Sequence, residues 1–309
     1  MTATTPMLRG GTRVSRLARW QTDRIMEALY LRAGAVCAAV TISTEGDRIL
    51  DRPLPEIGGK GVFTEALEDA LRNEAIDFAV HSLKDLPIEC PPDLVVAAVC
   101  MRADPRDVLI AREPRTLKTL PRGATVATSS TRRIAQLRAA RPDLAVVPLR
   151  GNVDTRVRKA LAGEVGAIVL AAAGVERLGL RDAIAEYLST DVMLPAPGQG
   201  ALAIQCRAED RSTRLLLEFM DDPHARTTTT AERTFLAHLG GGCAAPIAAL
   251  GEIVGGSARP TLRLRGRVAS VDGVRVVSVE DEAPVSESGG LAQRLAAEAA
   301  RRGARELIG

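Results

Sequence analysis

The stretch AIDFAVHSLKDLP, residues 75–87, decides the fold, because an apolar run gives way within it to a dense polar loop. Residues 75–80 are typical of a buried strand, which makes residues 81–87 the loop at its carboxyl end. Just before it, residues 61–73 carry apolar side chains at i, i+3 and i+4, a spacing that predicts a helix. A strand that follows a helix in this way indicates an α/β unit, and open α/β sheets bind ligands at the carboxyl ends of their strands.

The same alternation continues through the first two thirds of the chain, and a second α/β block begins near Asp104. Residues 194–198 resemble a crossing linker, and residues 201–206 are typical of a further strand. The strands expected in the second block are residues 107–111, 124–127, 145–149 and 167–170.

The last third of the chain changes character, which indicates a third, α+β domain from about Asp222. Helical patterns occur at residues 231–239, which end at three glycines, and at residues 291–307. Between them, residues 262–268 and 274–279 alternate apolar and polar side chains, as antiparallel strands with one solvated face do.

Composition narrows the class of protein. The 309 residues include 41 basic and 38 acidic side chains, so the net charge is only +3. Aromatic residues make up 2%, whereas nucleic-acid-binding proteins usually combine a basic excess with aromatic side chains that stack on bases. The composition therefore argues against a nucleic-acid partner. The basic residues are 37 arginines and four lysines, Lys60, Lys84, Lys118 and Lys159.

The sequence also bears on compartment and metal binding. No segment approaches the roughly 18 apolar residues of a membrane span, and residues 1–9 lack the apolar core of a signal peptide. The five cysteines are scattered without a Cys-x-x-Cys pair, and the three histidines lack neighbours suited to a metal centre. We therefore expect a cytoplasmic protein with reduced thiols, no membrane association and no metal.

The loop at residues 81–87 places an imidazole, a hydroxyl, an ammonium and a carboxylate within five positions. Burying such groups costs free energy, so their density at the end of a buried strand suggests a functional site. The alternative is a solvated loop with a local Lys84–Asp85 pair. A Schiff-base role for Lys84 is a further option, although nothing in the sequence supplies a carbonyl cofactor.

Arginines stand at several corners where a strand gives way to a helix, namely residues 128–133, residues 150–156, Arg13 with Ser15, and Arg177. Hydroxyls and free backbone N–H groups at a helix N-terminus bind anions, whereas the helix dipole disfavours cations there. Arginines at these corners are therefore favourable if they face an anion. Several guanidinium groups together would suit a polycarboxylate, because each can bind a carboxylate through two hydrogen bonds. The alternative is an ordinary cap with surface arginines.

Two glycine-rich segments present one reactive side chain each. Residues 58–61 lack the Ser or Thr of a phosphate-binding Walker loop, so they either present Lys60 to an anion or form a simple turn. Glycines 240–242 leave the thiol of Cys243 uncrowded, as a nucleophilic or covalently modified cysteine requires. An inert loop cysteine is the alternative.

These segments, in this order, resemble the porphobilinogen deaminase (hydroxymethylbilane synthase) family. The resemblance runs colinearly from about residue 12 to residue 247, and the last 60 residues match only in general character. The matching stretches are residues 12–15, 58–63, 81–87, 104–107, 128–133, 150–156, 195–201 and 241–243 with Pro246.

The resemblance implies an α/β fold with two periplasmic-binding-protein-like α/β domains flanking a cleft, and a smaller α+β C-terminal domain. We expect the first domain at residues 1–100 and 200–218, with the catalytic loop. The second, rich in arginine, is expected at residues 105–195, and the third, which bears the cofactor cysteine, at residues 222–309.

The reaction implied by the resemblance joins four porphobilinogen molecules head to tail, with loss of ammonia, and releases hydroxymethylbilane. The chain grows on a dipyrromethane cofactor bound to Cys243 through a thioether, and no metal takes part. We expect a monomer without nucleic-acid or membrane partners. The alternative function is a non-catalytic, two-domain protein that binds a small anion and needs neither Cys243 nor Asp85.

The resemblance also assigns residues to roles. Lys84 and Asp85 would be catalytic, because a carboxylate about 4 Å from the cation formed on deamination stabilises it by roughly 4 kcal/mol. Cofactor contacts would come from Lys84, Asp85, Ser129, Ser130, Arg132, Arg133 and Arg150 beside the covalent bond to Cys243. Substrate contacts would come from Arg13, Ser15, Lys60, Arg150, Arg156 and Arg177.

Five positions depart from the family pattern. Arg16 stands where the family commonly has proline, and Glu56 stands where a basic residue is often found. Gly240 replaces an acidic residue before the cysteine, and residues 244–245, both alanine, replace a bulkier and more polar pair after it. None of these changes removes a proposed catalytic group.

Overall fold

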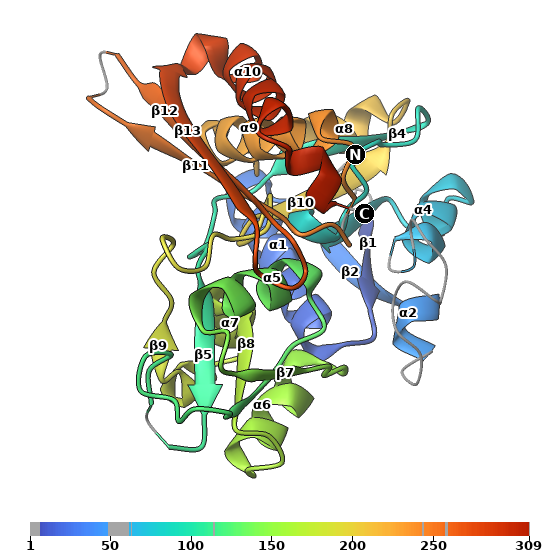
Figure 1. Ribbon diagram of the computed structural model, residues 1–309. Coiled ribbons are helices and arrows are strands. Elements are labelled where there is room, and N and C mark those ends of the chain that lie inside the picture. The colour runs from blue at the N-terminus through green and yellow to red at the C-terminus, as the bar shows by residue number, and fades with distance from the viewer. Residues whose placement is uncertain are drawn as a thin grey trace, which may run out of the picture. The chain divides into compact units, whose positions relative to one another are not determined.

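The computed structural model describes residues 7–48, 62, 64–113, 115–242, 244–256 and 259–308. The chain divides into two compact units, unit 1 with residues 1–102 and 201–226, and unit 2 with residues 103–200 and 227–309. Helices and strands alternate in both (Figure 1), which confirms the α/β class. Unit 2 combines the residues expected for the second and third domains, so the three-domain division stays a prediction.

Unit 1 contains a five-stranded sheet in the order β2-β1-β3-β10-β4. Strand β1 is parallel to β2 and β3, whereas β10 is antiparallel to both of its neighbours. The carboxyl ends of β1, β2 and β3 therefore share one edge with the beginning of β10. The strands are β1 (Leu8–Arg13), β2 (Cys37–Ile42), β3 (Phe78–Ser82), β4 (Leu94–Val99) and β10 (Leu202–Arg207).

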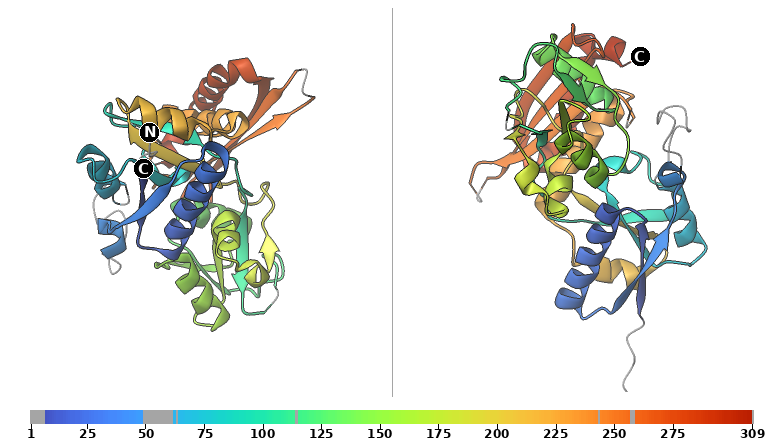
Figure 2. Two further views of the ribbon diagram at one scale, coloured as in Figure 1. Left: turned by 180° about the vertical axis from the view of Figure 1, so that it is seen from behind. Right: turned by 90° about the horizontal axis from the view of Figure 1, so that it is seen from below.

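Helix α1 packs against β1, β2 and β3 (Figure 2) and buries Ile25 and Leu29 in a core that includes Phe78 and Ile204. Burial of such side chains is the main force that holds helix and sheet together. The helices of unit 1 are α1 (Arg16–Ala33), α2 (Glu45–Arg48), α4 (Glu65–Arg72), the 3-10 helix η1 (Leu83–Asp85) and α8 (Arg211–Glu218).

The first sheet of unit 2 has the order β7-β6-β8-β5-β9. Strand β6 is parallel to β7 and β8, and β5 is antiparallel to β8 and β9. The strands are β5 (Asp107–Ala111), β6 (Thr125–Ala127), β7 (Ala145–Val147), β8 (Ala167–Ala171) and β9 (Glu186–Tyr187). The helices between them are α5 (Thr131–Ala140), α6 (Val153–Leu161), α7 (Ala172–Arg177) and η2 (Arg181–Ala183).

The second sheet of unit 2 is antiparallel, in the order β11-β12-β13, with α10 packed on β12 and β13 (Figure 1). Gly266 on β12 lets Phe235 of α9 approach, since a Cβ at Gly266 would lie 2.3 Å from the ring. The strands are β11 (Ile247–Val254), β12 (Thr261–Ala269) and β13 (Val276–Pro284). The helices are α9 (Pro223–His238), η3 (Val285–Glu287), α10 (Ser288–Arg301) and η4 (Ala304–Leu307).

The structure corrects the opening strand. Residues 75–80 were expected to form it, but β3 occupies residues 78–82. Residues 75 and 76 instead belong to the C-terminal turn that ends helix α4, because Ala75 N and Ile76 N both donate to the carbonyl of Ala70. The helix expected at residues 61–73 is α4, at residues 65–72, and residues 61 and 63 lie outside the described part of the chain.

Three further elements in the last third differ from expectation. Helix α9 begins at Pro223, eight residues before the expected start. The single helix expected at the C-terminus breaks at Gly303, whose φ of +86° is left-handed and ends α10 before η4. Strand β11 was not predicted, because its first five residues are all buried and lack the alternation of a half-exposed strand. The antiparallel pair expected at residues 262–268 and 274–279 is confirmed as β12 and β13.

A search of the described residues for a helix with the length and apolar character needed to span a membrane finds none.

Candidate active site

The loop that carries Lys84 and Asp85 is fixed at the edge of the sheet in unit 1. Strand β3 ends at Ser82 and leads directly into η1. Leu83 and Leu86 are buried on either side, and Leu83 N donates to the carbonyl of Ala201 at 3.0 Å. Asp85 is exposed and Lys84 half-buried. Apolar anchors thus hold a short polar turn whose carboxylate faces solvent.

Arg13 and Ser15 lie at the same edge, at the end of the neighbouring strand β1. Arg13 is the last residue of β1, and Ser15 caps α1 by accepting a hydrogen bond from Ala18 N at 3.2 Å. Gln21 of α1 donates from Nε2 to Ser82 Oγ at 3.1 Å, which ties the helix to the end of β3. Parallel pairing of β1 and β3 therefore brings two separate sequence motifs to one edge.

His81, which opens the polar loop in the sequence, belongs to the core. Its side chain is buried, and burial lowers the pKa of His81 to about 4, with the positive charge of Arg13 adding to the shift. The imidazole is therefore neutral near pH 7. It adds no charge to the edge that carries Lys84 and Asp85.

In unit 2, three predicted motifs meet at one edge of the sheet because β6, β7 and β8 are parallel. Ser129 and Ser130 follow β6, Arg150 follows β7, and Arg177 ends the helix after β8. Ser129 Oγ donates to Leu149 O and accepts from Leu149 N, both at 3.0 Å, which joins the first corner to the second. Arg156 lies in the first turns of α6, beyond the same edge.

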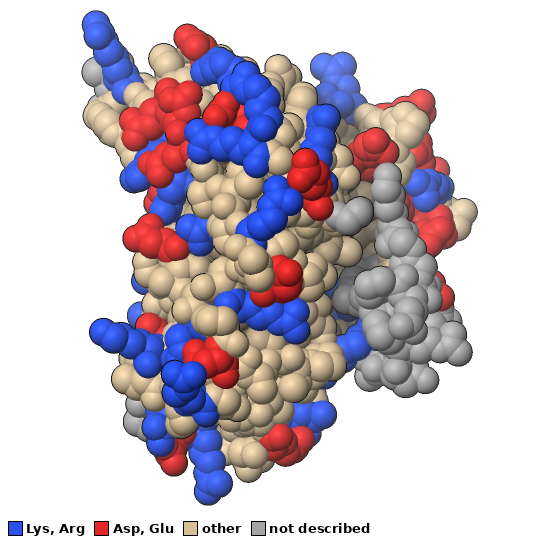
Figure 3. Space-filling view, in the orientation of Figure 1, with Lys and Arg blue, Asp and Glu red and all other residues tan. Residues whose placement is uncertain are grey.

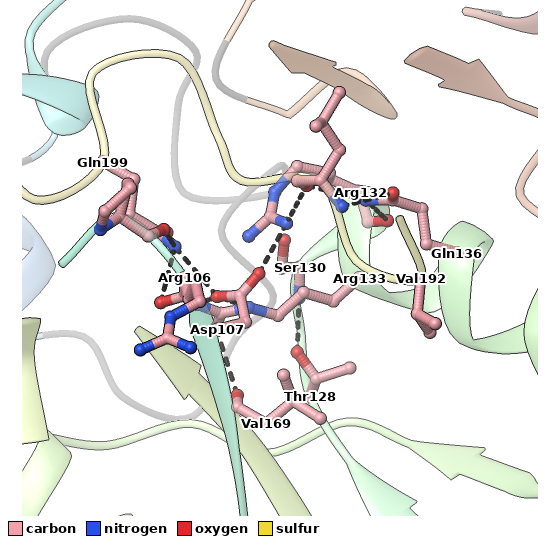
Figure 4. A network of polar contacts seen from close by, with 12 residues as sticks. Arg106, Asp107, Thr128, Ser130, Arg132, Arg133, Gln136, Val169, Val192 and Gln199 are labelled. Carbon is pink, nitrogen blue, oxygen red and sulfur yellow. Dashed lines mark hydrogen bonds and ion pairs between the residues drawn. The ribbon is translucent and has the colours of Figure 1, made fainter. Parts of the chain in front are cut away.

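Arg132 and Arg133, in the first turn of α5, bind a carboxylate of the protein itself (Figure 4). Arg132 Nη1 lies 2.7 Å from Asp107 Oδ2 and 2.7 Å from Leu194 O. Arg133 donates from Nε and Nη2 to Asp107 Oδ1 at 3.1 and 2.7 Å, and from Nη1 to Val169 O at 3.1 Å. Both arginines are buried.

Asp107 is the centre of this network. The carboxylate is fully buried at the start of β5, and Gln199 Nε2 donates to its Oδ1 at 3.0 Å. Burial alone would raise the pKa of Asp107, but the charges and hydrogen bonds of Arg132 and Arg133 outweigh it and hold the pKa far below its ordinary value. Asp107 therefore stays ionised and pairs with both guanidinium groups.

Arg150 offers an unused donor at the same edge. Its Nη1 atom is buried and has no hydrogen-bond partner among the described residues. A buried guanidinium N–H without an acceptor is costly unless a ligand supplies one. The predicted residues Lys60 and Cys243 lie outside the described part of the chain.

Two of the four described cysteines, Cys37 and Cys206, are poorly suited to nucleophilic attack. Burial raises the pKa of the Cys206 thiol to about 11, and burial also raises the pKa of Cys37. A high pKa leaves little thiolate near neutral pH, and the thiolate is the nucleophile.

Sequence reasoning missed Asp107, Gln136 and Gln199 as parts of the site. Gln136 binds both backbone groups of Leu194, by accepting from Leu194 N at 2.9 Å and donating to Leu194 O at 3.0 Å. For Asp107 the available signal was a carboxylate directly before four apolar residues, which places a charge at the start of a buried strand. No local signal marks the two glutamines.

Each unit thus presents a sheet edge with polar side chains, one with an ammonium and a carboxylate, the other with arginines and hydroxyls at helix N-termini. These edges define an α/β protein suited to a polycarboxylate ligand. Two family models match the chain, "Porphobilinogen deaminase, dipyromethane cofactor binding domain" over residues 8–215 and "Porphobilinogen deaminase, C-terminal domain" over residues 226–301. The chain belongs to the porphobilinogen deaminase family.

Curated relatives agree along almost the whole chain. The porphobilinogen deaminase of Roseiflexus sp. (strain RS-1) is 50% identical over 299 residues, which cover 96% of this chain and 97% of the relative. Porphobilinogen deaminase 1 of Streptomyces coelicolor is 47% identical over 311 residues, with 98% and 97% covered. The family expected from the motifs is confirmed, and the catalytic interpretation is supported over non-catalytic anion binding.

Among solved structures, a periplasmic substrate-binding protein of an ABC transporter from Coxiella burnetii aligns with a TM-score of 0.45. It is 14% identical, and the alignment covers 74% of this chain and 97% of that one.

Replacement of Asp107 by Asn should lower the free energy of unfolding by about 3–5 kcal/mol at pH 7, because two buried guanidinium groups lose their counter-ion. Since folding depresses the pKa of Asp107, its contribution is present above the unfolded value of about 4 and is lost as the pH falls further. Urea unfolding at a series of pH values measures both effects.

The matched control is Asp182→Asn, which removes an exposed carboxylate of the same unit. Below about pH 4 the parent should lose stability more steeply than Asp107→Asn. Equal stability of the two variants at pH 7 would show that the buried pairs contribute nothing.

Proposed function

We propose that the chain condenses four porphobilinogen molecules head to tail into hydroxymethylbilane, with release of ammonia, on a covalently bound dipyrromethane. The observation that carries the proposal is the family match over both parts of the chain, combined with the meeting of three separate motifs at one edge of the sheet in unit 2. Arginines there suit the acetate and propionate groups that every pyrrole ring of substrate and product carries.

The residues of this chain fit a polycarboxylate cofactor. The buried, unpartnered Nη1 of Arg150 needs an acceptor, and Ser129 and Ser130 stand before the N-terminus of α5, where backbone N–H groups bind anions. The cofactor would be attached covalently to Cys243. The residues that would bind it without a covalent bond are Lys84, Asp85, Ser129, Ser130, Arg132, Arg133 and Arg150. When bound, this group supplies the primer to which substrate rings are joined.

Arg132 and Arg133 contribute differently to this site. All three nitrogens of Arg133 donate to protein acceptors, so only the second N–H of Nη1 and of Nη2 remains for a ligand. Arg132 Nε is buried without a partner, which leaves Arg132 a donor that a ligand could use. We therefore propose Arg132 as the direct contact and Arg133 as the residue that keeps the first turn of α5 in place.

Asp85 is the group that stabilises the cation formed when ammonia leaves. Its exposed carboxylate is held by the buried side chains of Leu83 and Leu86. At about 4 Å and an effective dielectric constant near 20, such a pair is stabilised by roughly 4 kcal/mol. Asp85 also transfers protons at the pyrrole nitrogens, and the ammonium of Lys84 binds a neighbouring carboxylate of the ligand.

In this proposal the substrate carboxylates are bound by Arg13, Ser15, Lys60, Arg150, Arg156 and Arg177. Arg177 Nη2 donates to Gly200 O at 2.7 Å, so one side of its guanidinium is fixed by the backbone. We further propose that the protein is a cytoplasmic monomer. The four described cysteines are thiols rather than disulfides, as in a reducing compartment.

The intact mass of the purified protein tests the function. We expect an excess over the 32.7 kDa chain that equals one dipyrromethane. The excess should be absent from Cys243→Ser and present in Cys90→Ser, a control that removes an exposed thiol elsewhere. A bare-chain mass for the parent, from cells that make porphobilinogen, would overturn the proposal.

Replacement of Arg150 by Leu should slow cofactor assembly and the first additions about tenfold to a hundredfold, because a charge-assisted hydrogen bond to a carboxylate is lost. Mass spectra during turnover should show unloaded or early species accumulating. Arg158→Leu, at an exposed position of the adjacent helix α6, is the control. Parental rates in Arg150→Leu would mean that Arg150 does not bind the ligand.

Replacement of Asp85 by Asn should lower kcat roughly a thousandfold, which corresponds to the loss of about 4 kcal/mol of charge stabilisation. The KM for porphobilinogen should change much less, because the anion-binding groups remain. Steady-state kinetics of the loaded protein measure both constants, with Asp69→Asn, an exposed carboxylate of α4, as control. A kcat near the parental value would contradict the role of Asp85.

A further inference from the structure

Thr131, the first residue of α5, makes an unusual contact that the predicted site does not include. Its hydroxyl Oγ1 donates to the backbone carbonyl of Ala244, a residue 113 positions away in the sequence. Ala244 directly follows Cys243 in the chain. Helix α5 follows Ser129 and Ser130, which together with Arg150 form the proposed anion-binding corner. The start of this helix is therefore bonded to the backbone next to the proposed attachment cysteine.

The hydroxyl of Thr131 does not cap its own helix. The N-cap residue of α5 is Ser130, and neither the geometry nor the partner of the Thr131 bond is that of a cap. A hydroxyl that capped the helix would accept from a backbone N–H one turn ahead. Thr131 instead donates a hydrogen bond to a distant carbonyl, so the bond joins two segments of unit 2.

Helix α5 is itself held against the second sheet of unit 2 farther along its length. Gln136 Oε1 accepts from Arg267 Nη1 of β12 at 3.1 Å, and Arg138 Nη1 donates to Val271 O at 2.9 Å. Gly273 allows a close backbone approach there, because a Cβ at this position would lie 2.5 Å from Ala139 N. The second half of the helix is therefore fixed against this part of unit 2, which restrains the position of its first residue.

The flanks of residue 243 are also tied to the fold. Ala245 N donates to Gly242 O at 3.0 Å, and Ala269 N of β12 donates to Pro246 O at 3.3 Å. Strand β11 begins at Ile247, whose side chain is buried. The bond from Thr131 thus adds a contact to the anion-binding corner for a segment that is also held by its own neighbours and by β12.

We propose that Thr131 is a positioning residue for cofactor attachment, which holds the backbone at Ala244 so that the group on Cys243 meets the N-terminus of α5. This inference rests on the proposed function. Attachment breaks the aminomethyl C–N bond of porphobilinogen and forms a C–S bond to Cys243, and the thiol proton leaves with the amine as ammonia. A second porphobilinogen is joined in the same way, with its ammonia taking a proton from the carbon of the first ring.

The rate of mass gain tests this inference. Full-length protein made without porphobilinogen is given porphobilinogen, and its intact mass is followed with time. Thr131→Val keeps the shape but removes the donor, so it should load about threefold to tenfold more slowly than the parent, the effect of one neutral hydrogen bond. Thr131→Ser keeps the hydroxyl and should load close to the parental rate.

The control is Thr230→Val, the same chemical change at an exposed position of α9, which should load like the parent. Hydrogen exchange of the peptide that spans residues 240–246, in the unloaded protein, should be faster in Thr131→Val alone. This second measurement follows the bond itself and does not depend on turnover.

The outcomes are distinguishable. Parental loading by Thr131→Val, or equal slowing in Thr131→Ser or Thr230→Val, overturns the positioning role while the attachment at Cys243 stands. A parent that gains no mass at all overturns the attachment, and the positioning role with it.

Discussion

One buried carboxylate, that of Asp107, organises the first turn of helix α5 in unit 2. Removing a charge from water costs several kcal/mol, which is recovered only when partners of opposite charge and further donors surround it. Arg132, Arg133 and Gln199 provide this, and they come from two segments far apart in the sequence. The pairs therefore fix three parts of the chain at once, the start of β5, the first turn of α5 and the segment before residue 200.

The same interaction explains a feature that the sequence leaves open. Two arginines at a helix N-terminus oppose the helix dipole unless they face an anion. That anion is the protein's own Asp107, which pairs with both arginines and offsets one of their two positive charges. In the proposed function, the donors left for a ligand are backbone N–H groups, the serine hydroxyls, Arg150 and the unpartnered Nε of Arg132.

Local patterns were enough to predict the α/β class, most strands and the family, because apolar runs and strand-to-helix corners are encoded within short windows. They could not predict the partners of Arg133 or the amide contacts of Gln136, which depend on pairing across many residues. General arginine content also misleads: basic and acidic side chains intermingle over the face in Figure 3. Exposed pairs such as Arg19–Asp23 contribute about 0–1 kcal/mol each.

The order of strands in unit 1 has a consequence for synthesis on the ribosome. Strand β10 lies between β3 and β4, although about a hundred residues separate it from β4 in the chain. The nascent chain thus finishes every strand of the first sheet of unit 2 before it can complete that of unit 1. Until residue 207 emerges, β3 and β4 each keep an unpaired edge, the kind of surface that recruits other strands and favours aggregation. The N-terminal sheet therefore depends on a strand from much later in the sequence until that strand has been synthesised.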